Sequence, residues 1–429
     1  MTDKDVTMKK HLRYAALGTA GVLAFALAGC TGGAPGGGGN DDPDTISFMI
    51  GNPEDPADLE LTEADMAKFE EETGIHVDLK VIPIENVQTI VQTQLRSGEG
   101  PDVFGYDTGP GFAGALAEAG LVYPLTDAYE KYDWPVYDFA KERVTFDGEI
   151  VGIPNDIETL GLYYNATVFD DLGIDRPEST DDLMDACLTI KDAGLIPVAL
   201  NDLDGWQGGH YLSVILSSMV GSAGMESLID GSTSWDSPEV VDALTLLKDF
   251  NEAGCFPPSP VAIDYDNGNA LFYSGQAAMN LTGSWLVQDT QRNVDFEVAY
   301  IPFPGPDGPG VFSGGLGAGL FVNATTKKAE SALTFLDYMM TQEHGAWVIQ
   351  NTQSIPAFPI DTSGIEATPL FTQVLDDAAK IAEGTSDFGY NIDVLTTAEF
   401  NQAMWDGVQA VLTGQATPEE VAANLEANR

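Results

Sequence analysis

Carboxylate and amide side chains follow apolar segments of this 429-residue chain at points where β-strands are expected to end. Carboxylates accept hydrogen bonds and amides both donate and accept them, so such groups can hold a small polar solute in one orientation. In α/β proteins the ligand lies at the carboxyl ends of the strands, which is where these side chains fall. The candidate polar contacts are Asn52 and Glu54 after the first strand, Tyr106 and Asp107 at the end of the third, and Asn155, Asp156 and Glu158 beyond Pro154.

The chain shows no catalytic signature. It lacks the HExxH, GxSxG and GxxxxGK[ST] patterns, and glycines 315, 317 and 319 have the wrong spacing for a dinucleotide-binding turn. Four His and three Cys leave little for soft-metal or thiol chemistry, so we predict no metal site and no cofactor. A pair of carboxylates could serve as the catalytic acids of a secreted glycoside hydrolase. In so acidic a chain, however, such a pair is expected by chance and does not indicate a hydrolase.

The charge balance excludes several classes of partner. With 67 Asp and Glu against 18 Lys and Arg, the formal net charge is −49. Phosphate backbones and anionic lipid surfaces would be repelled, so we predict no nucleic-acid partner. Most of the carboxylates are expected to be solvated surface charges. Two explanations of their excess stay open, which are solubility at high salt and an acidic bias of the lineage.

The first 29 residues have the composition of a secretory signal peptide. Basic residues precede an uncharged apolar run from Tyr14 to Ala28, which is too short for a comfortable membrane span. The run ends Leu27-Ala28-Gly29-Cys30, which resembles the lipobox of bacterial lipoproteins, and we predict lipid attachment at Cys30. The Gly-rich residues 30–44 are expected to be a flexible tether. The mature protein is therefore expected on the extracellular side of the cytoplasmic membrane, held there by its lipid.

Two cysteines remain once Cys30 is assigned to lipid. In an oxidising compartment only one pairing is then possible, Cys187 with Cys255, and it would clamp two neighbouring helices. The alternative is two independent buried thiols, which are common in folded proteins.

The apolar periodicity predicts an α/β lobe at the start of the mature chain. Strand-like segments at 45–50, 75–82 and 102–106 alternate with helical spacing at 62–72 and 86–97. Strands separated by helices of this length imply a parallel sheet covered on both faces, a doubly wound lobe.

Beyond residue 155 the pattern becomes helix-rich and predicts a second lobe. Helices are expected at 180–193, 211–219, 238–253 and 269–273. The Pro- and Gly-rich residues 295–323 are where the chain could return to the first lobe, before helices at 329–340, 369–382 and 397–412.

A series of short motifs runs through the chain in one order. They include Gly100-Pro101-Asp102-Val103-Phe104, Gly152-Ile153-Pro154, Leu162-Tyr163-Tyr164-Asn165, Phe272-Tyr273-Ser274-Gly275-Gln276-Ala277-Ala278-Met279, Gly283-Ser284-Trp285 and Leu412-Thr413-Gly414-Gln415. Behind a lipobox, this series resembles the extracellular solute-binding proteins of carbohydrate ABC importers, the maltose-binding-protein-like group, from about Thr45 to the C-terminus.

The resemblance implies a type II periplasmic-binding-protein-like α/β fold. It has two lobes, each with a doubly wound sheet, and a cleft between them that closes on the solute. We expect lobe one at 46–155 plus 305–352 and lobe two at 156–304 plus 353–429.

The resemblance also implies a saccharide site, which needs flat aromatic platforms beside polar groups. Trp285 corresponds to a position where the family often places its main stacking aromatic. Trp206 lies in the polar residues 201–210, expected to be a loop, and Trp405 lies in the helix at 397–412. Core packing is the alternative for each of them, and the helical spacing of Trp405 slightly favours it there. The backbone amides of Gly314 and Gly315 are expected to approach the ligand.

The function that the resemblance implies is non-enzymatic. We expect a monomer that binds a mono- or oligosaccharide and delivers it to the permease subunits of an ABC importer. The alternatives are a binder of another solute, such as a peptide or polyamine, and the secreted glycoside hydrolase.

Overall fold

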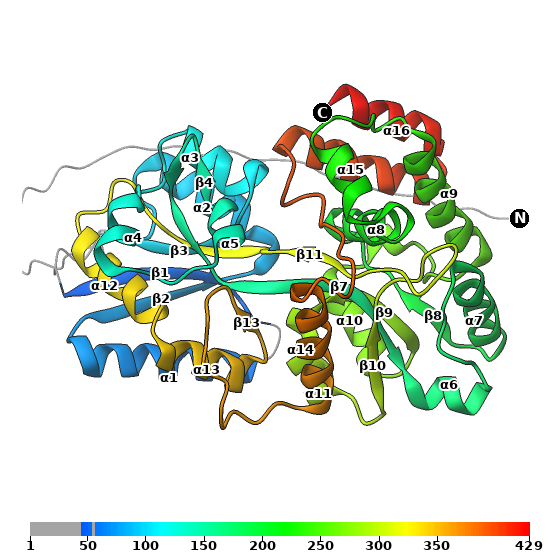
Figure 1. The fold of residues 1–429 in the computed structure, drawn as a ribbon, viewed down its shortest axis with the longest axis horizontal. Coiled ribbons are helices and arrows are strands. Elements are labelled where there is room, and N and C mark those ends of the chain that lie inside the picture. The colour runs from blue at the N-terminus through cyan, green and yellow to red at the C-terminus, as the bar shows by residue number, and fades with distance from the viewer. Residues whose placement is uncertain (1–43, 54–55) are drawn as a thin grey trace, which may run out of the picture. The chain divides into compact units, whose positions relative to one another are not determined.

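The computed structural model describes residues 44–53 and 56–429, apart from the side chains of Pro56 and Ala382. The predicted signal peptide at 1–29, the lipidation site Cys30, the tether up to residue 43 and the candidate Glu54 lie outside the described residues. From Asp44 onward the chain forms two sheets that each carry helices on both faces, as Figure 1 shows. We call the first sheet with its helices lobe one and the second lobe two.

Lobe one is built on a five-stranded sheet. Its strands are β1 (Thr45–Gly51), β2 (His76–Ile82), β3 (Val103–Asp107), β6 (Gly152–Pro154) and β12 (Ala318–Val322), in the order β2-β1-β3-β12-β6. β1 is parallel to β2 and β3, whereas β12 pairs antiparallel with β3 and β6. Its other elements are α1 (Pro56–Thr73), η1 (Ile84–Asn86), α2 (Val87–Ser97), η2 (Pro110–Gly114), α3 (Ala115–Glu118), α4 (Thr126–Tyr132), α5 (Asp138–Glu142), the hairpin β4 (Thr145–Phe146) and β5 (Glu149–Ile150), α12 (Ala329–Met339) and α13 (Gln342–Thr352).

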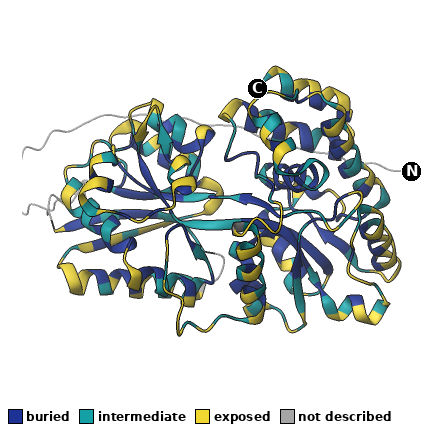
Figure 2. Ribbon diagram, viewed as in Figure 1, coloured by how far each residue is buried: buried dark blue, intermediate teal, exposed yellow. Residues whose placement is uncertain are grey.

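Successive residues of β1 point to opposite faces of this sheet, and each face is covered by helices. Phe48 packs with Phe69 of α1 and Phe335 of α12 on one face, where the Phe335 ring lies edge-on to both. Met49 packs with Val91 of α2 and other apolar residues on the opposite face. Buried residues therefore lie on both sides of the strands, as Figure 2 shows, which confirms the doubly wound lobe predicted from the periodicity.

Lobe two is built on a second sheet with the order β10-β7-β9-β8, to which β11 and β13 add by pairing with β7. The strands are β7 (Asp156–Asn165), β8 (Ile196–Ala199), β9 (Ala277–Gly283), β10 (Val298–Ile301), β11 (Ser313–Gly315) and β13 (Ile355–Pro356). The helices are α6 (Ala166–Leu172), α7 (Thr180–Asp192), α8 (Trp206–Ile229), α9 (Pro238–Ala253), η3 (Pro260–Ala262), α10 (Tyr265–Tyr273), η4 (Ser284–Leu286), α11 (Val287–Asn293), α14 (Pro369–Ala382), α15 (Ala398–Leu412) and α16 (Pro418–Ala427).

The two faces of the second sheet bury different helices. Leu162 of β7 packs in a core shared by α7, α8, α9, α15 and α16, whereas its neighbour Tyr163 packs with α10, α11 and α14. Among the described residues, α8 alone is long and apolar enough to span a membrane. Its Leu212 and Leu216 are buried in the core, and Gly221, with φ 66°, interrupts its helical backbone. Glycine adopts this angle without steric cost, so α8 is a kinked core helix of lobe two.

The chain passes between the sheets at three places. It leaves lobe one between Pro154, the end of β6, and Asp156, the start of β7. The return differs from the predicted position at 305, because β11 still pairs with β7 and the crossing follows Gly315. The final passage also lies later than residue 352 and is not a single step, since β13 pairs with β7 and the next residues, Ala357 and Phe358, remain in the core of lobe one. Pro and Gly mark a change of direction but do not say which sheet a short strand will join, so the sequence placed both boundaries too early.

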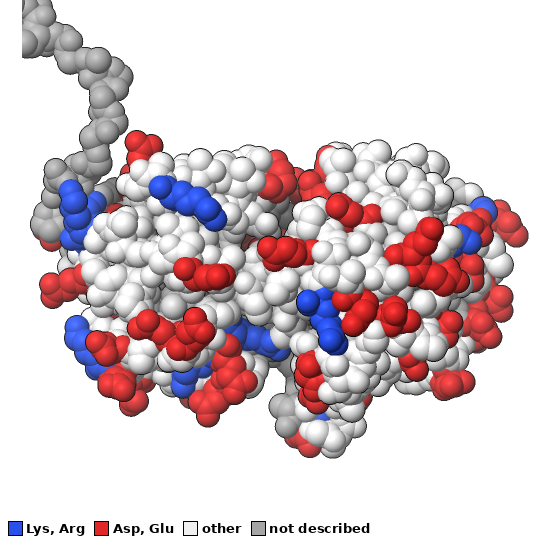
Figure 3. Space-filling view, turned by 90° about the horizontal axis from the view of Figure 1, so that it is seen from above, with Lys and Arg blue, Asp and Glu red and all other residues white. Residues whose placement is uncertain are grey.

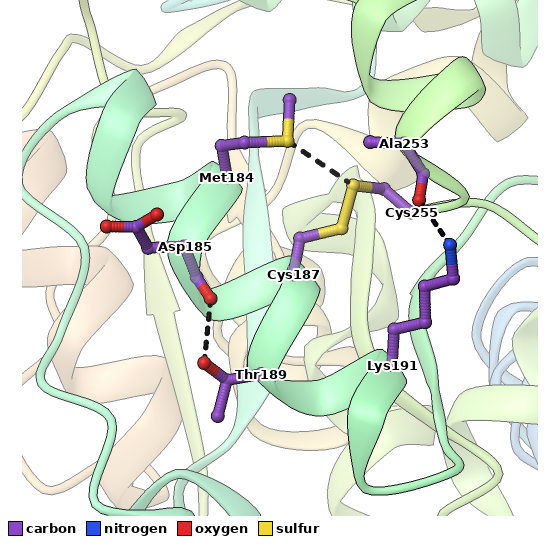
Figure 4. Close-up of a disulfide and its surroundings, with 7 residues drawn as sticks. All are labelled: Met184, Asp185, Cys187, Thr189, Lys191, Ala253 and Cys255. Atoms are coloured by element: carbon purple, nitrogen blue, oxygen red, sulfur yellow. Dashed lines mark hydrogen bonds between the residues drawn. A yellow bond between two sulfur atoms is a disulfide. The ribbon is translucent and has the colours of Figure 1, made fainter.

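A disulfide joins Cys187 of α7 to Cys255, which follows α9, with the two Cα atoms 5.5 Å apart (Figure 4). Beside it, Nζ of Lys191 donates a hydrogen bond to the carbonyl of Ala253 at 2.5 Å, and Sδ of Met184 lies 3.9 Å from Sγ of Cys255. The bridge therefore fastens two helices on the same flank of lobe two.

The acid excess is visible on the surface. The face in Figure 3 carries Asp and Glu side chains over both lobes, interrupted by few Lys and Arg. Most of these carboxylates are solvated, as the sequence predicts. Among the described acids, the buried ones are Asp65, Asp202, Asp289 and Asp393.

Candidate functional site

A cavity of about 1080 Å³ lies between the two lobes. Its walls come from the ends of β1, β3 and β6, the start of β7, and the helices α1, α8, α10, α13 and α15. It therefore stands at the carboxyl ends of the parallel strands, where α/β proteins bind their ligands. Small-molecule pockets span about 300–1,000 Å³, so this cavity has room for a ligand of more than one ring.

Four rings from lobe two form an aromatic group on one wall. The Trp206 ring lies 4.8 Å from Tyr265 and 5.1 Å from His210, and His210 lies 6.0 Å from Trp285, measured between ring centroids. Nε1 of Trp285 donates a hydrogen bond to Oη of Tyr265 at 2.7 Å, which fixes the orientation of the indole. Gly283 lies directly under this indole, where a Cβ would overlap the ring. Because Trp206 and Trp285 are only half-buried, part of each ring can stack against an apolar ligand face.

Trp405 reaches the cavity from α15 and touches both lobes. It packs against the core of lobe two and also against lobe one, where its ring centroid lies 6.4 Å from that of Phe112. Its Nε1 is buried and has no hydrogen-bond partner among the described residues. A buried donor without an acceptor costs free energy, so an acceptor supplied at this point would be favourable.

Four acidic side chains from three chain segments form what we call the carboxylate group. Asp107 ends β3, Asp156 and Glu158 begin β7, and Asp393 lies between α14 and α15. Burial raises the pKa of Asp107 to about 6, of Asp156 to about 7 and of Glu158 to about 8. Repulsion adds to this, because Asp393 raises the pKa of Asp107 and Asp156 raises that of Glu158.

Neutral donors oppose these shifts only weakly. Nε2 of Gln88 donates to Oδ2 of Asp107 at 3.4 Å, and the backbone N–H of Gly317 donates to Oε2 of Glu158 at 3.1 Å. Both bonds lower the pKa of their acceptors, yet burial remains the larger effect. In their ionised forms, the members of the carboxylate group therefore repel one another and lack full hydration. Binding of protons or of a positively charged ligand would lower this cost.

A polar contact crosses the mouth of the cavity. Nε2 of Gln288 in α11 donates to Oδ1 of Asp58 in α1 at 3.1 Å, and Nη1 of Arg292 donates to the same oxygen. Because Asp58 belongs to lobe one and its partners to lobe two, the contact holds the lobes together at this edge.

Most of the candidate site residues named from the sequence line this cavity. The candidates that line the cavity are Asn52, Tyr106, Asp107, Asn155, Asp156, Glu158, Trp206, Trp285 and Trp405. Their roles in binding stay predictions, and Glu54 lies outside the described residues.

Two expectations about this region are wrong. Gly314 and Gly315 lie in β11 opposite Thr159 and Glu158, and neither is among the described residues that line the cavity. A Cβ at Gly314 would overlap the carbonyl of Glu158, so this glycine permits close strand pairing, whereas Gly317 further along the chain does line the cavity. Trp206 also lies outside any loop, because it is the first residue of α8, directly after Gly205 with φ 86°.

Sequence reasoning missed the residues that helices bring to the cavity. His210, Tyr265 and Asp393 line it, and so does Trp347 of α13, whose ring stacks on His344 at 5.6 Å with 15° between the planes. The aromatic pair at i and i+3 was a usable signal, but no helix was expected there. Among the residues that the structure describes, no group of three or more His, Cys, Asp or Glu could hold a metal ion.

Comparison with known proteins places the chain in a family. Residues 54–346 match the family described as bacterial extracellular solute-binding protein. The chain belongs to this family. A relative of this solute-binding protein, the "Multiple sugar-binding protein" of Streptococcus mutans serotype c, is 26% identical over 371 residues, covering 83% of this chain and 84% of the relative.

Solved structures show the same fold as this solute-binding protein. One, from a study of xylan utilization by the thermophilic bacterium Caldanaerobius polysaccharolyticus, has a TM-score of 0.80 at 24% identity and covers 89% of this chain and 99% of its own. A chitin oligosaccharide binding protein has a TM-score of 0.77 at 24% identity, with coverage of 90% and 98%. The type II periplasmic-binding-protein fold predicted from the sequence is thereby confirmed.

Proposed function

We propose that this solute-binding protein captures a mono- or oligosaccharide in the cavity between its lobes and delivers it unchanged to the permease of an ABC importer. The observation that carries the proposal is the half-buried pair Trp206 and Trp285 beside a wall of carboxylates and amides. Pyranose rings offer apolar C–H faces for stacking and hydroxyls for hydrogen bonds, so they match both parts of this wall. The names of the sugar-binding relative and the chitin oligosaccharide binding protein support the same ligand class.

Capture involves movement of the lobes about the three crossings. Ligand groups that touch Asp107 in lobe one and Trp285 in lobe two at once are bound only when the lobes are near each other. Ligand binding therefore favours the closed arrangement, which Asp58 and Arg292 also stabilise. The permease would recognise this arrangement and open it.

The anchor belongs to the same proposal. A diacyl chain on Cys30, followed by the tether at 30–44, keeps a monomeric receptor beside its permease on the outer face of the cytoplasmic membrane. Wild-type protein expressed in a bacterial host should partition into detergent, and Cys30→Ser should partition into water. Equal partitioning of the two would overturn the anchor without affecting the ligand proposal.

Titration of the intrinsic Trp fluorescence with a panel of mono- and oligosaccharides tests the ligand proposal. We expect a saturable change for at least one saccharide, because Trp206 and Trp285 face the cavity. The same saccharide should be recovered intact after incubation, whereas shorter products would indicate the hydrolase instead. A response to peptides or spermidine and to no saccharide would overturn the proposal.

A further inference from the structure

We infer that the saccharide held in this cavity carries a free amino group, so that the ligand class is a cationic amino sugar or its oligomer. The inference rests on the proposed saccharide function and narrows it. It follows from the charges that line the cavity, from the depth at which they lie, and from buried polar atoms that have no partner.

The cavity wall is negative along its whole length. Eleven of the residues that line it are Asp or Glu, and no Lys or Arg lies among the described lining residues. Two His, His210 and His344, are the remaining basic side chains there. A bound cation would therefore meet attraction from several directions, against which only the two His side chains among the described lining residues could place a positive charge.

The general acid excess of the chain does not account for the deepest of these charges. A carboxylate on the outer surface keeps its hydration and costs little, whereas one placed among protein atoms loses part of it. Asp393 is buried and Asp107 and Glu158 are half-buried in the cavity wall, and the three carboxylates repel one another. Such a cluster destabilises the empty protein, so it is a feature of ligand binding rather than of solubility.

Two buried side chains at this point each have one polar atom without a hydrogen-bond partner among the described residues, although Nε2 of His210 itself lies 3.2 Å from Nδ2 of Asn391. Asp393 is 5% exposed, and its Oδ1 has no hydrogen-bond partner among the described residues, while its Oδ2 lies 3.6 Å from Nε2 of His210. His210 is 6% exposed, and its Nδ1 also lacks a partner within the described chain. The unpartnered Nδ1 of His210 lies outside the carboxylate group, although Nε2 of the same ring contacts Asp393, and it is a second sign that a polar ligand completes the site.

The chemistry favours an ammonium group over a hydroxyl. A hydroxyl donates one hydrogen bond and brings no charge, so it leaves neighbouring carboxylates repelling each other. An ammonium donates three hydrogen bonds and neutralises one negative charge at a site where partial burial weakens the screening by water. The described residues form no arrangement that could coordinate a metal ion, which leaves an organic cation. The flat faces of Trp206 and Trp285 favour a cyclic cation over a linear polyamine.

Three tetrasaccharides with the same β-1,4-linked glucopyranose backbone provide the test. They carry at C2 a hydroxyl (cellotetraose), an acetamido group (the N-acetylglucosamine tetramer) or a free amine (the glucosamine tetramer). Isothermal titration is run with these, with the three matching monosaccharides and with the saccharide panel described above. We expect an amine-bearing member to bind at least about tenfold more tightly than its hydroxyl and acetamido counterparts. The advantage should shrink as salt rises from about 0.01 M to about 0.15 M, where the screening length falls from about 30 Å to about 8 Å.

Variants that remove one carboxylate charge test whether the tighter binding of the amine-bearing ligand arises at the carboxylate group. Asp393→Asn should weaken binding of the amine-bearing ligand about tenfold and should change binding of its hydroxyl counterpart less than about threefold. Asp107→Asn, in which the amide oxygen can still accept from Gln88, is the second variant if Asp393→Asn does not fold. Glu85→Gln removes the same charge from the exposed rim of the cavity and should leave the amine advantage within about twofold of wild type.

The outcomes separate the two proposals. Equal or tighter binding of a neutral saccharide overturns the amine inference and leaves the saccharide function standing. A wild-type amine advantage that persists in both Asp393→Asn and Asp107→Asn also overturns it. Binding of spermidine alone, or of no compound in the panel, overturns both.

Discussion

Replacing Glu158 by Gln removes one charge from the cavity and changes little else. Gly317 donates its N–H to Oε2 of Glu158 at 3.1 Å, and a Gln side chain of the same shape can accept this bond. Burial raises the pKa of Glu158 from 4.5 to about 8, so between these values the folded protein keeps a proton that the unfolded chain releases. The stability of the wild-type protein therefore falls as the pH rises through this window.

The expected gain follows from the size of this shift. One pKa unit corresponds to about 1.4 kcal/mol, so at pH 8 the charge costs at most about 4 kcal/mol. Glu158 borders an open cavity whose solvent screens part of this cost, and we expect Glu158→Gln to gain about 2 kcal/mol at pH 8. At a pH near 5 the gain should be below about 0.5 kcal/mol, because this pH lies only about half a unit above the unfolded pKa of 4.5 and most of the shift is not yet expressed.

Urea unfolding at about pH 5 and pH 8, followed by Trp fluorescence, measures the effect. Glu85→Gln serves as the control, since its side chain lies in water and its loss should change the free energy of unfolding by less than about 0.5 kcal/mol. If wild type and Glu158→Gln lose stability in parallel between the two pH values, the carboxyl group is hydrated and the reasoning is refuted.

Four other perturbations have defined outcomes. Trp285→Ala should raise the Kd for the bound saccharide at least about tenfold in calorimetry, because a stacking contact of about 1.5 kcal/mol is lost, and Trp285→Phe should lose less. Replacing Cys187 and Cys255 together by Ser should lower the free energy of unfolding by about 4 kcal/mol, since the bridge spans 68 residues, and alkylation with mass spectrometry shows whether the bridge forms. Gly314→Ala should lower the Tm by several degrees in calorimetry, because its Cβ overlaps the carbonyl of Glu158 and overpacking costs about 1–3 kcal/mol. Asp58→Asn should weaken saccharide affinity by about two- to fivefold, the worth of a partly exposed ion pair, and should enlarge the liganded protein in small-angle scattering.

The first three strands of lobe one could be predicted from the sequence because each one alternates or is uniformly apolar, whereas the short β6 and the distant β12 were not predicted as individual strands. The predicted segment at 75–82 corresponds to β2, and 102–106 corresponds to β3. The start of α1 was placed wrongly at Thr62, whose hydroxyl in fact donates within the helix to the carbonyl of Asp58. A Thr three residues before an acidic residue resembles the start of a helix, yet a Thr side chain also fits inside one. The local pattern therefore could not tell whether Thr62 begins the helix or lies within it.

Site residues at the ends of strands could be predicted from the sequence, whereas most site residues on helices could not. A strand end has one location in the fold, so Asp107 and Glu158 could be assigned to the cavity from order alone. The face of a helix that meets a cavity depends on how the helix packs, which the sequence of α8 does not reveal because it is apolar all round. His210 was missed for this reason, Asp393 because it lies in the segment between α14 and α15 that carries no periodic pattern, and Trp347 because α13 itself was not expected.

Strand β12 lies between β3 and β6, although nearly all of lobe two separates it from them along the chain. A nascent polypeptide that has only reached residue 154 therefore lacks the middle of its first sheet and cannot close that core. Ribosomal synthesis must proceed past Val322 before lobe one can form. An export machinery that threads extended chains would thus receive this polypeptide while it is still unfolded, before folding of lobe one could block its translocation.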